Sequence, residues 1–139
     1  MSATTTVPVQ DRTERTAHPV RRVTVVAAFA GAAAATAFAA VARAAGVPFE
    51  IDGEQIPLGG FATLTVFGAA LGGILLVVTN RYAARPRRRF LQATVALTAL
   101  SCIPSLAAPP DAASKTALVA AHVLAAAVVV PVLARHAHR

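Results

Sequence analysis

His122 is the ionisable side chain that lies deepest inside a long apolar run of this sequence. Such a group must be compensated by a partner, and it is therefore a candidate proton relay, ligand contact or metal ligand. The alternative is a structural role. A neutral imidazole needs one hydrogen-bond donor and one acceptor as partners, and a hydroxyl or a backbone carbonyl of a facing helix supplies them. Both the functional and the structural interpretation of His122 are open at this point.

Hydroxyl side chains recur at helical spacing in the preceding apolar run, at Thr94, Thr98 and Ser101. This spacing predicts a narrow polar stripe that faces neighbouring helices rather than lipid. The hydroxyls either form hydrogen bonds within and between helices or line a path for a small solute. Together with His122, these three residues form the candidate intramembrane polar site.

Signatures of enzymes and metal centres are missing from the sequence. Cys102 is the only cysteine and lies in an apolar run, where a thiol behaves mostly as a small hydrophobe. The apolar runs contain no pair of carboxylates, and no phosphate-binding glycine loop occurs. We therefore expect no catalytic residue, no metal and no cofactor. A haem with two histidine ligands would require two chains, because His18, His136 and His138 lie outside the apolar runs.

Arginines dominate the segment between the second and third apolar runs. This basic loop carries five of the thirteen lysines and arginines, namely Arg81, Arg85, Arg87, Arg88 and Arg89. The net charge of +7 is compatible with nucleic acid as a partner. Basic residues that flank apolar runs, however, are typical of orientation signals and of anchors to anionic lipid. We expect anionic lipid of the inner leaflet, and not nucleic acid, to be the partner of this loop.

The composition indicates a membrane protein. Of the 139 residues, 56% are hydrophobic and 14% are charged, and the mean hydropathy is +0.62. Soluble proteins are about 45–50% apolar and about 25% charged. Four apolar runs are each long enough for a helix to cross a hydrocarbon core of roughly 30 Å. The expected spans are residues 23–42, 61–79, 90–108 and 116–134.

The flanking segments complete the expected domain organisation. Residues 1–22 are polar and predict a disordered cytoplasmic tail, residues 23–135 a single membrane domain, and residues 136–139 a cytoplasmic end. The first run contains no leucine or isoleucine. A signal peptide that is cleaved near residues 42–45 is therefore the alternative to a retained first helix.

The connection between the first two spans alternates apolar and acidic residues around Asp52-Gly53. Asp-Gly is a favoured two-residue hairpin turn, because both positions accept a positive φ. The pattern predicts a short β-hairpin that rests on the helices, with a plain irregular loop as the alternative.

Small residues at four-residue spacing favour close helix packing. Gly68 and Gly72 form such a pair, which packs either within the bundle or between two copies of the chain as a homo-oligomer. Two further stripes occur in the first and last runs: Ala27, Gly31, Ala35 and Ala39, then Ala117, Ala121 and Ala125.

The basic residues also predict the orientation. With both termini in the cytoplasm, eleven of the thirteen lie inside, and only Arg43 and Lys115 lie outside. The sequence thus predicts an all-α bundle of four transmembrane helices in the cell membrane, with its N- and C-termini inside.

Four segments together resemble a family of small four-helix bacterial membrane proteins of unknown function. They are residues 49–61, 85–90, 94–101 with Pro104, and 122–131, and the resemblance covers residues 22–135. The resemblance implies four spans and brings no activity or cofactor with it. We expect a non-enzymatic structural, accessory or interaction module. The alternative is an oligomeric transporter of a small solute, or one coupled to protons, that uses the candidate polar site.

Overall fold

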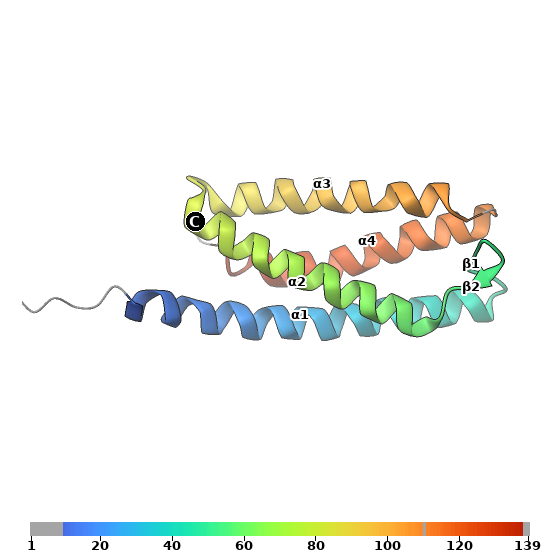
Figure 1. Cartoon of the computed structure of the whole chain (residues 1–139), viewed down its shortest axis with the longest axis horizontal. Coiled ribbons are helices and arrows are strands. Elements are labelled where there is room, and N and C mark those ends of the chain that lie inside the picture. The colour runs from blue at the N-terminus through green and yellow to red at the C-terminus, as the bar shows by residue number, and fades with distance from the viewer. Residues whose placement is uncertain (1–9, 110, 138–139) are drawn as a thin grey trace, which may run out of the picture.

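The computed structural model describes residues 10–109 and 111–137 and is an up-and-down bundle of four helices (Figure 1). The helices are α1 (Gln10–Ala44), α2 (Leu58–Tyr82), α3 (Pro86–Ala107) and α4 (Ala112–Ala134). All four contain a segment long and apolar enough to cross a membrane. The predicted all-α fold with four candidate spans is therefore confirmed. Apolar runs of this length favour helices, because a helix pairs its backbone groups within the segment.

The helix boundaries differ from the expected ones most at the N-terminus. The sequence predicts a disordered tail over residues 1–22, whereas α1 begins at Gln10 and is helical through residues 10–22. The prediction for residues 1–9 lies outside the described residues. A formed helix adds one hydrogen bond for each further residue that it fixes, so an apolar span can extend into polar sequence. α2, α3 and α4 likewise begin about one turn before the expected position.

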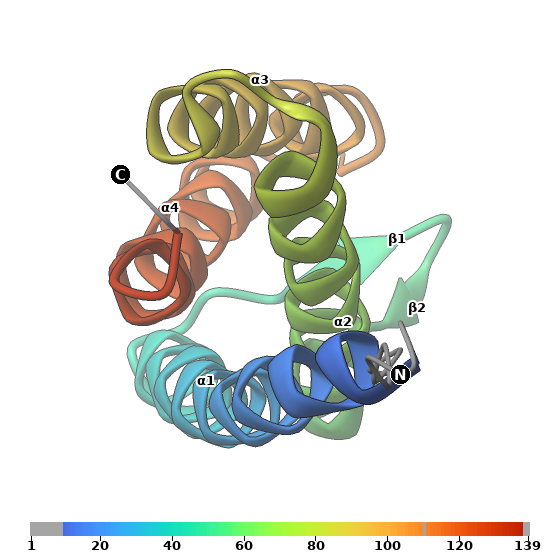
Figure 2. The same ribbon diagram turned by 90° about the vertical axis from the view of Figure 1, so that its left-hand side faces the viewer.

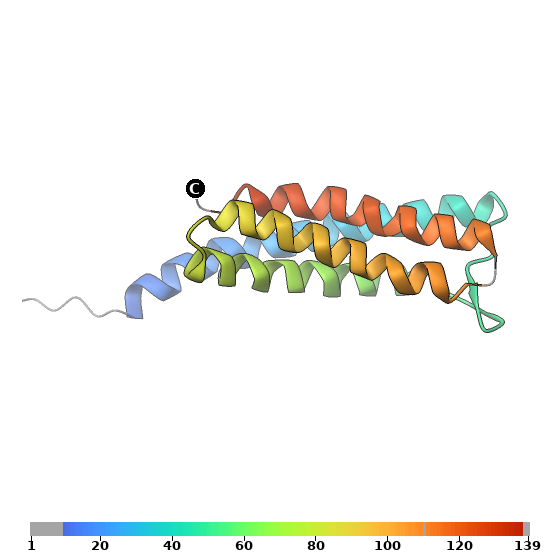
Figure 3. The same ribbon diagram turned by 90° about the horizontal axis from the view of Figure 1, so that it is seen from above.

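The bundle has two distinct ends. α1 packs along α2 and α4, and α3 packs mainly on α4 and then on α2, away from α1 (Figure 2). The basic loop, the start of α1 and the end of α4 lie together at one end, which we call the basic-loop end (Figures 1 and 3). The connections between α1 and α2 and between α3 and α4 lie at the opposite end, which we call the hairpin end.

A two-stranded antiparallel hairpin gives the hairpin end its name. It consists of β1 (Glu50–Ile51) and β2 (Glu54–Gln55), with Ile51 opposite Glu54. The turn residues Asp52 and Gly53 both have positive φ values, 53° and 82°, as a two-residue turn of this kind requires. The predicted hairpin at Asp52-Gly53 is therefore confirmed, and the irregular loop is not what forms.

The hairpin is fastened to the helices through Phe49. Its side chain is fully buried and meets the ring of Phe61 edge to face, with ring centroids 5.2 Å apart. Its backbone N–H donates to Oγ of Ser114 at 3.0 Å, near the start of α4, and its carbonyl accepts from the N–H of Ile56 at 2.8 Å. The guanidinium of Arg43 donates to the carbonyl of Ile56. These contacts join the first interhelical connection to α4.

Asp111 precedes α4 and caps it. Its carboxylate accepts a hydrogen bond from the N–H of Ser114 at 2.7 Å, which pairs one of the free donors at the helix start. This backbone hydrogen bond stabilises the ionised form, so it lowers the pKa of Asp111 below its ordinary value of 3.8.

Buried apolar side chains form one cluster near each end of the bundle. The cluster near the hairpin end consists of Ala39, Phe49, Phe61, Ala117, Leu118 and Ala121. The cluster near the basic-loop end is built around Leu76, Phe90 and Leu133, with alanines of α1, α2 and α4. Alanines in both clusters let the helices approach closely, which confirms that the small-residue stripes of α1 and α4 are packing surfaces.

Glycines provide the closest helix contacts, but the pair at four-residue spacing is only partly involved. A Cβ atom at Gly72 would lie 2.9 Å from Cδ1 of Leu133 on α4, whereas a Cβ atom at Gly68 would meet nothing within 4 Å. The tightest approaches are instead at Gly73, against Thr24 of α1, and at Gly31, against Val129 of α4. Packing within the chain therefore uses Gly72 but leaves Gly68 on the open side of α2.

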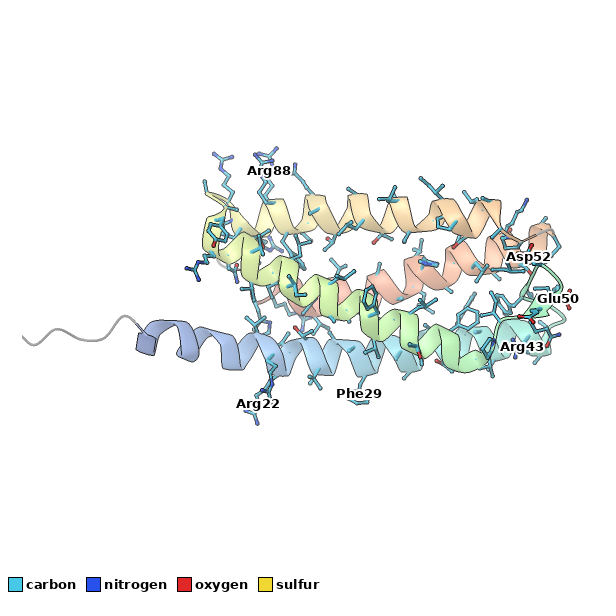
Figure 4. The ribbon with its side chains drawn as sticks, in the orientation of Figure 1. Arg22, Phe29, Arg43, Glu50, Asp52 and Arg88 are labelled. Atoms are coloured by element: carbon cyan, nitrogen blue, oxygen red, sulfur yellow. The ribbon has the colours of Figure 1, made fainter. Side chains whose placement is uncertain are left out.

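The outer surface of the bundle is apolar along its length. Phe29 is 73% exposed and points away from the helices, and Phe67 and Ile103 are also exposed (Figure 4). A soluble monomer rarely exposes contiguous apolar surface on this scale. The surface therefore fits the hydrocarbon of a bilayer, and the chain has the character of a multi-pass membrane protein.

Candidate functional site

His122 lies on α4 and is partly buried. Its Nδ1 atom is 2.8 Å from the carbonyl oxygen of Leu118, one turn earlier on the same helix. Because a carbonyl oxygen only accepts hydrogen bonds, Nδ1 is the donor in this contact. The imidazole thus has a structural partner within its own helix.

Ser105 of α3 is the residue from another helix that approaches His122. Its buried Oγ is 3.4 Å from Nδ1 of His122 and 3.5 Å from the carbonyl of Ser101. Both distances are long for hydrogen bonds, so the pair is a weak contact. Ser105 is not among the residues that the sequence predicts for the candidate site. Its position four residues after Ser101 continues the polar stripe and is the signal that could have identified it.

The hydroxyl groups of the three predicted stripe residues donate hydrogen bonds within their own helix. Oγ1 of Thr94 donates to the carbonyl of Phe90 at 3.0 Å, and Oγ1 of Thr98 donates to the carbonyl of Thr94 at 2.8 Å. Oγ of Ser101 donates to the carbonyl of Thr98 at 2.7 Å. Hydroxyls that bond to the preceding turn leave their proton unavailable to a solute. The structure therefore brings Ser105, and none of these three hydroxyls, into hydrogen-bonding range of His122.

No candidate metal cluster occurs in the described part of the chain, since no three histidine, cysteine, aspartate or glutamate side chains come together there. Cys102 is a free thiol of intermediate exposure on α3. The arrangement around His122 supplies the second ring nitrogen, Nε2, and one weakly held hydroxyl. Such a pair can hold two helices in register, or it can accept a single hydrogen bond from a ligand.

The basic loop adjoins a cavity of about 680 Å³ between the end of α2 and the start of α3. Arg85, Arg88 and Arg89 line it, whereas Arg81 and Arg87 do not. The guanidinium of Arg81 lies over the ring of Tyr82 instead, 5.6 Å from its centroid. Arg88 extends outward from the start of α3 (Figure 4). The structure thus divides the five predicted anchor residues into three that share a cavity and two that do not.

Comparison with known proteins identifies a family. Residues 15–139 match the family of unknown function DUF6069. No curated protein and no solved structure matches the chain. The match covers α1 from residue 15 onward, the hairpin and the other three helices, and it attaches no activity to any residue.

Proposed function

Since the chain belongs to the family of unknown function DUF6069, its role must be argued from its own residues, and we propose that it is a non-enzymatic interaction or accessory module of the bacterial cell membrane. One observation carries this proposal. The hydroxyls of Thr94, Thr98 and Ser101 all donate to carbonyls of their own helix. A polar stripe that is satisfied in this way stabilises a helix in lipid and offers little to a passing solute.

The proposed orientation has both termini and the basic loop in the cytoplasm. The distribution of basic residues between the two ends of the bundle supports this orientation, because the basic loop shares its end with the start of α1 and the end of α4 (Figure 1). Arg43 and Lys115 are the basic residues of the opposite end. A reporter fused at Gly53 should read outside and one fused after Arg85 should read inside. The opposite pattern would overturn this orientation.

The proposed partners are lipid and protein, and not nucleic acid. Each arginine near an anionic inner leaflet contributes about 1 kcal/mol of attraction. Gly68 lies on the open side of α2 beside exposed Leu64 and Leu71, which supports a contact with a second copy of the chain. Replacing Gly68 by leucine should then reduce crosslinking between copies in native membranes, and replacing exposed Ala70 by leucine is the matched control. Equal crosslinking in both variants would contradict a contact at Gly68.

The alternative is a small-solute or proton-coupled transporter, for which the His122–Ser105 contact is the supporting observation. Cysteine accessibility separates the two functions. Thr94→Cys, Thr98→Cys and His122→Cys are made in a Cys102→Ser background and treated in native membranes with a thiol reagent that does not cross membranes. We expect no labelling from either side, whereas a cysteine at position 53 should react from outside.

Labelling of the Thr98→Cys and His122→Cys variants would reveal a water-filled path. The proposal of an interaction module would then be rejected in favour of a transporter. His122→Ala gives a second measurement. It should change the stability or assembly of the bundle and leave fluxes across reconstituted vesicles unchanged. Crosslinked pull-down from native membranes then identifies the protein partner.

A further inference from the structure

The cavity at the basic-loop end combines an apolar wall with a cationic rim. Val78 and the buried Thr79 of α2 contribute to its wall, and Tyr82, which is 76% exposed, stands beside them. Arg85, Arg88 and Arg89 line the cavity from the loop and from the first turn of α3. We call this cavity the arginine pocket. Its volume of about 680 Å³ is in the range of small-molecule sites.

The charge of the arginine pocket is not neutralised by neighbouring acids in the sequence. No aspartate or glutamate occurs between Glu54 and Asp111, a stretch that contains all of α2, the basic loop and all of α3. Three arginines that share a cavity repel one another unless an anion lies among them. The pocket is therefore electrostatically suited to a bound anion.

The start of α3 adds to this suitability. α3 has 22 residues, and its N-cap residue, Arg85, makes no capping hydrogen bond with its side chain. The first backbone N–H groups of a helix have no partner within the helix, and together with the helix dipole they favour a bound anion. Pro86 at the first position has no N–H group, so the helix start adds to the charge of the arginines through the N–H groups of the residues that follow it and through the helix dipole.

The apolar surface next to the arginine pocket favours anions that carry an apolar tail. Val77 and Val78 are exposed at the end of α2, so the apolar outer surface of the bundle continues to the edge of the pocket. A ligand with a phosphate group and an apolar tail would place its phosphate on the arginines and its tail along α2. Arginine forms two parallel hydrogen bonds with a phosphate group, which adds geometric selectivity to charge attraction.

We propose that the arginine pocket is a binding site for a phosphate-bearing anion, and that the phosphate belongs to the headgroup of an anionic phospholipid. This inference rests on the proposed location of the basic loop at a membrane surface. It goes beyond a general lipid anchor, because it assigns the binding to Arg85, Arg88 and Arg89 and excludes Arg81 and Arg87. An inorganic phosphate ion shares the recognised chemistry and must be distinguished by experiment.

The basic loop itself offers a matched pair of variants. R88Q/R89Q removes two charges from the arginine pocket, and R81Q/R87Q removes two charges from the same loop outside it. The full chain is reconstituted in nanodiscs of phosphatidylcholine and phosphatidylglycerol in equal amounts. After mild delipidation, native mass spectrometry counts the phosphatidylglycerol molecules that remain bound. Circular dichroism verifies that each variant is helical.

We expect wild type and R81Q/R87Q to retain phosphatidylglycerol and R88Q/R89Q to bind it roughly tenfold more weakly than R81Q/R87Q does. Equally weakened binding of phosphatidylglycerol in both variants would show that the charge of the whole loop attracts the lipid, and it would overturn the assignment of the arginine pocket as a specific site. Equal retention of phosphatidylcholine and phosphatidylglycerol by wild type would also overturn it. If R88Q/R89Q does not fold, R85Q compared with R87Q provides the same test.

A second arm separates the two sources of phosphate. Inorganic phosphate is added to the wild-type nanodiscs before delipidation, and retention of phosphatidylglycerol should not change. If inorganic phosphate displaces the lipid, the arginine pocket is still a phosphate-binding site, but its assignment to a phospholipid headgroup is overturned. The reporter fusions at Gly53 and after Arg85 report on orientation alone. Failure of the proposed orientation is therefore distinguishable from failure of the arginine pocket.

Discussion

The contact between Gly73 of α2 and Thr24 of α1 allows a quantitative test of the bundle. A Cβ atom at Gly73 would lie 2.5 Å from Oγ1 of Thr24 and 2.7 Å from its Cγ2. Atoms of real Cβ groups do not approach so closely, so Gly73→Ala must displace either the threonine side chain or the helix. Thr24 cannot move freely, because its hydroxyl donates to the carbonyl of Val20 at 2.8 Å.

Gly68→Ala is the matched control, because it lies on the same helix and its new methyl group would meet nothing within 4 Å. Both substitutions gain the same helix propensity, about 1 kcal/mol. When both variants are monomeric in the micelle, the proposed contact between copies at Gly68 does not contribute, and the difference in unfolding free energy isolates the steric cost at Gly73. Overpacking of a tight site costs about 1–3 kcal/mol. We expect Gly73→Ala to be less stable than Gly68→Ala by that amount.

Equilibrium unfolding in mixed detergent micelles, followed by circular dichroism, measures both variants. Thr24→Ala removes the two closest atoms and should recover most of the cost in the double variant Thr24→Ala/Gly73→Ala. Residues in direct contact show coupling energies of about 0.5–3 kcal/mol. Equal stability of the Gly73→Ala and Gly68→Ala variants, or a double variant without coupling, would refute the close packing of α1 on α2.

Three further predictions concern the hairpin end. Phe49→Ala should reduce the unfolding free energy by roughly 3 kcal/mol, because it empties a buried aromatic site; Phe29→Ala, on the exposed surface, should have little effect in the same unfolding assay. Gly53→Val forces a β-branched residue to a φ of 82° and should cost about 1–2 kcal/mol, seen as faster proteolysis of the hairpin loop. The backbone hydrogen bond from Ser114 lowers the pKa of Asp111, so it stabilises the folded state fully when the pH is above 3.8, the ordinary pKa of this group. The stabilisation should be lost as the pH falls through the lowered pKa of the folded state. Thermal melts between neutral and acid pH should show this loss in wild type and not in Asp111→Asn.

Local chemistry explains which parts of the fold were predictable. The four helices follow from apolar runs of spanning length, and the turn at Asp52-Gly53 follows from the φ values that those two residues accept. The extension of α1 back to Gln10 was not predicted, because polar residues that continue an existing helix carry no apolar period.

Tertiary contacts were less accessible from the sequence. Spacing alone indicated Gly68 and Gly72 as the packing pair, but only the arrangement of the helices shows that Gly73 meets α1 and that Gly68 is open. The candidate polar site was predicted from helical period, which places residues on one face and does not reveal their hydrogen-bond partners. Ser105 therefore replaces Thr94, Thr98 and Ser101 as the neighbour of His122.

The hydrogen bond from the N–H of Phe49 to Ser114 also has a consequence for the time course of synthesis. The two residues are 65 positions apart, so at about 5–20 residues per second the amide of Phe49 waits roughly 3–13 s after translation for its acceptor to be made. During that interval the hairpin, α2 and α3 are translated, while the start of α4 does not yet exist. The buried position of Phe49 can be completed only when nearly the whole chain has been translated, so closure of the hairpin end is a late event in biogenesis.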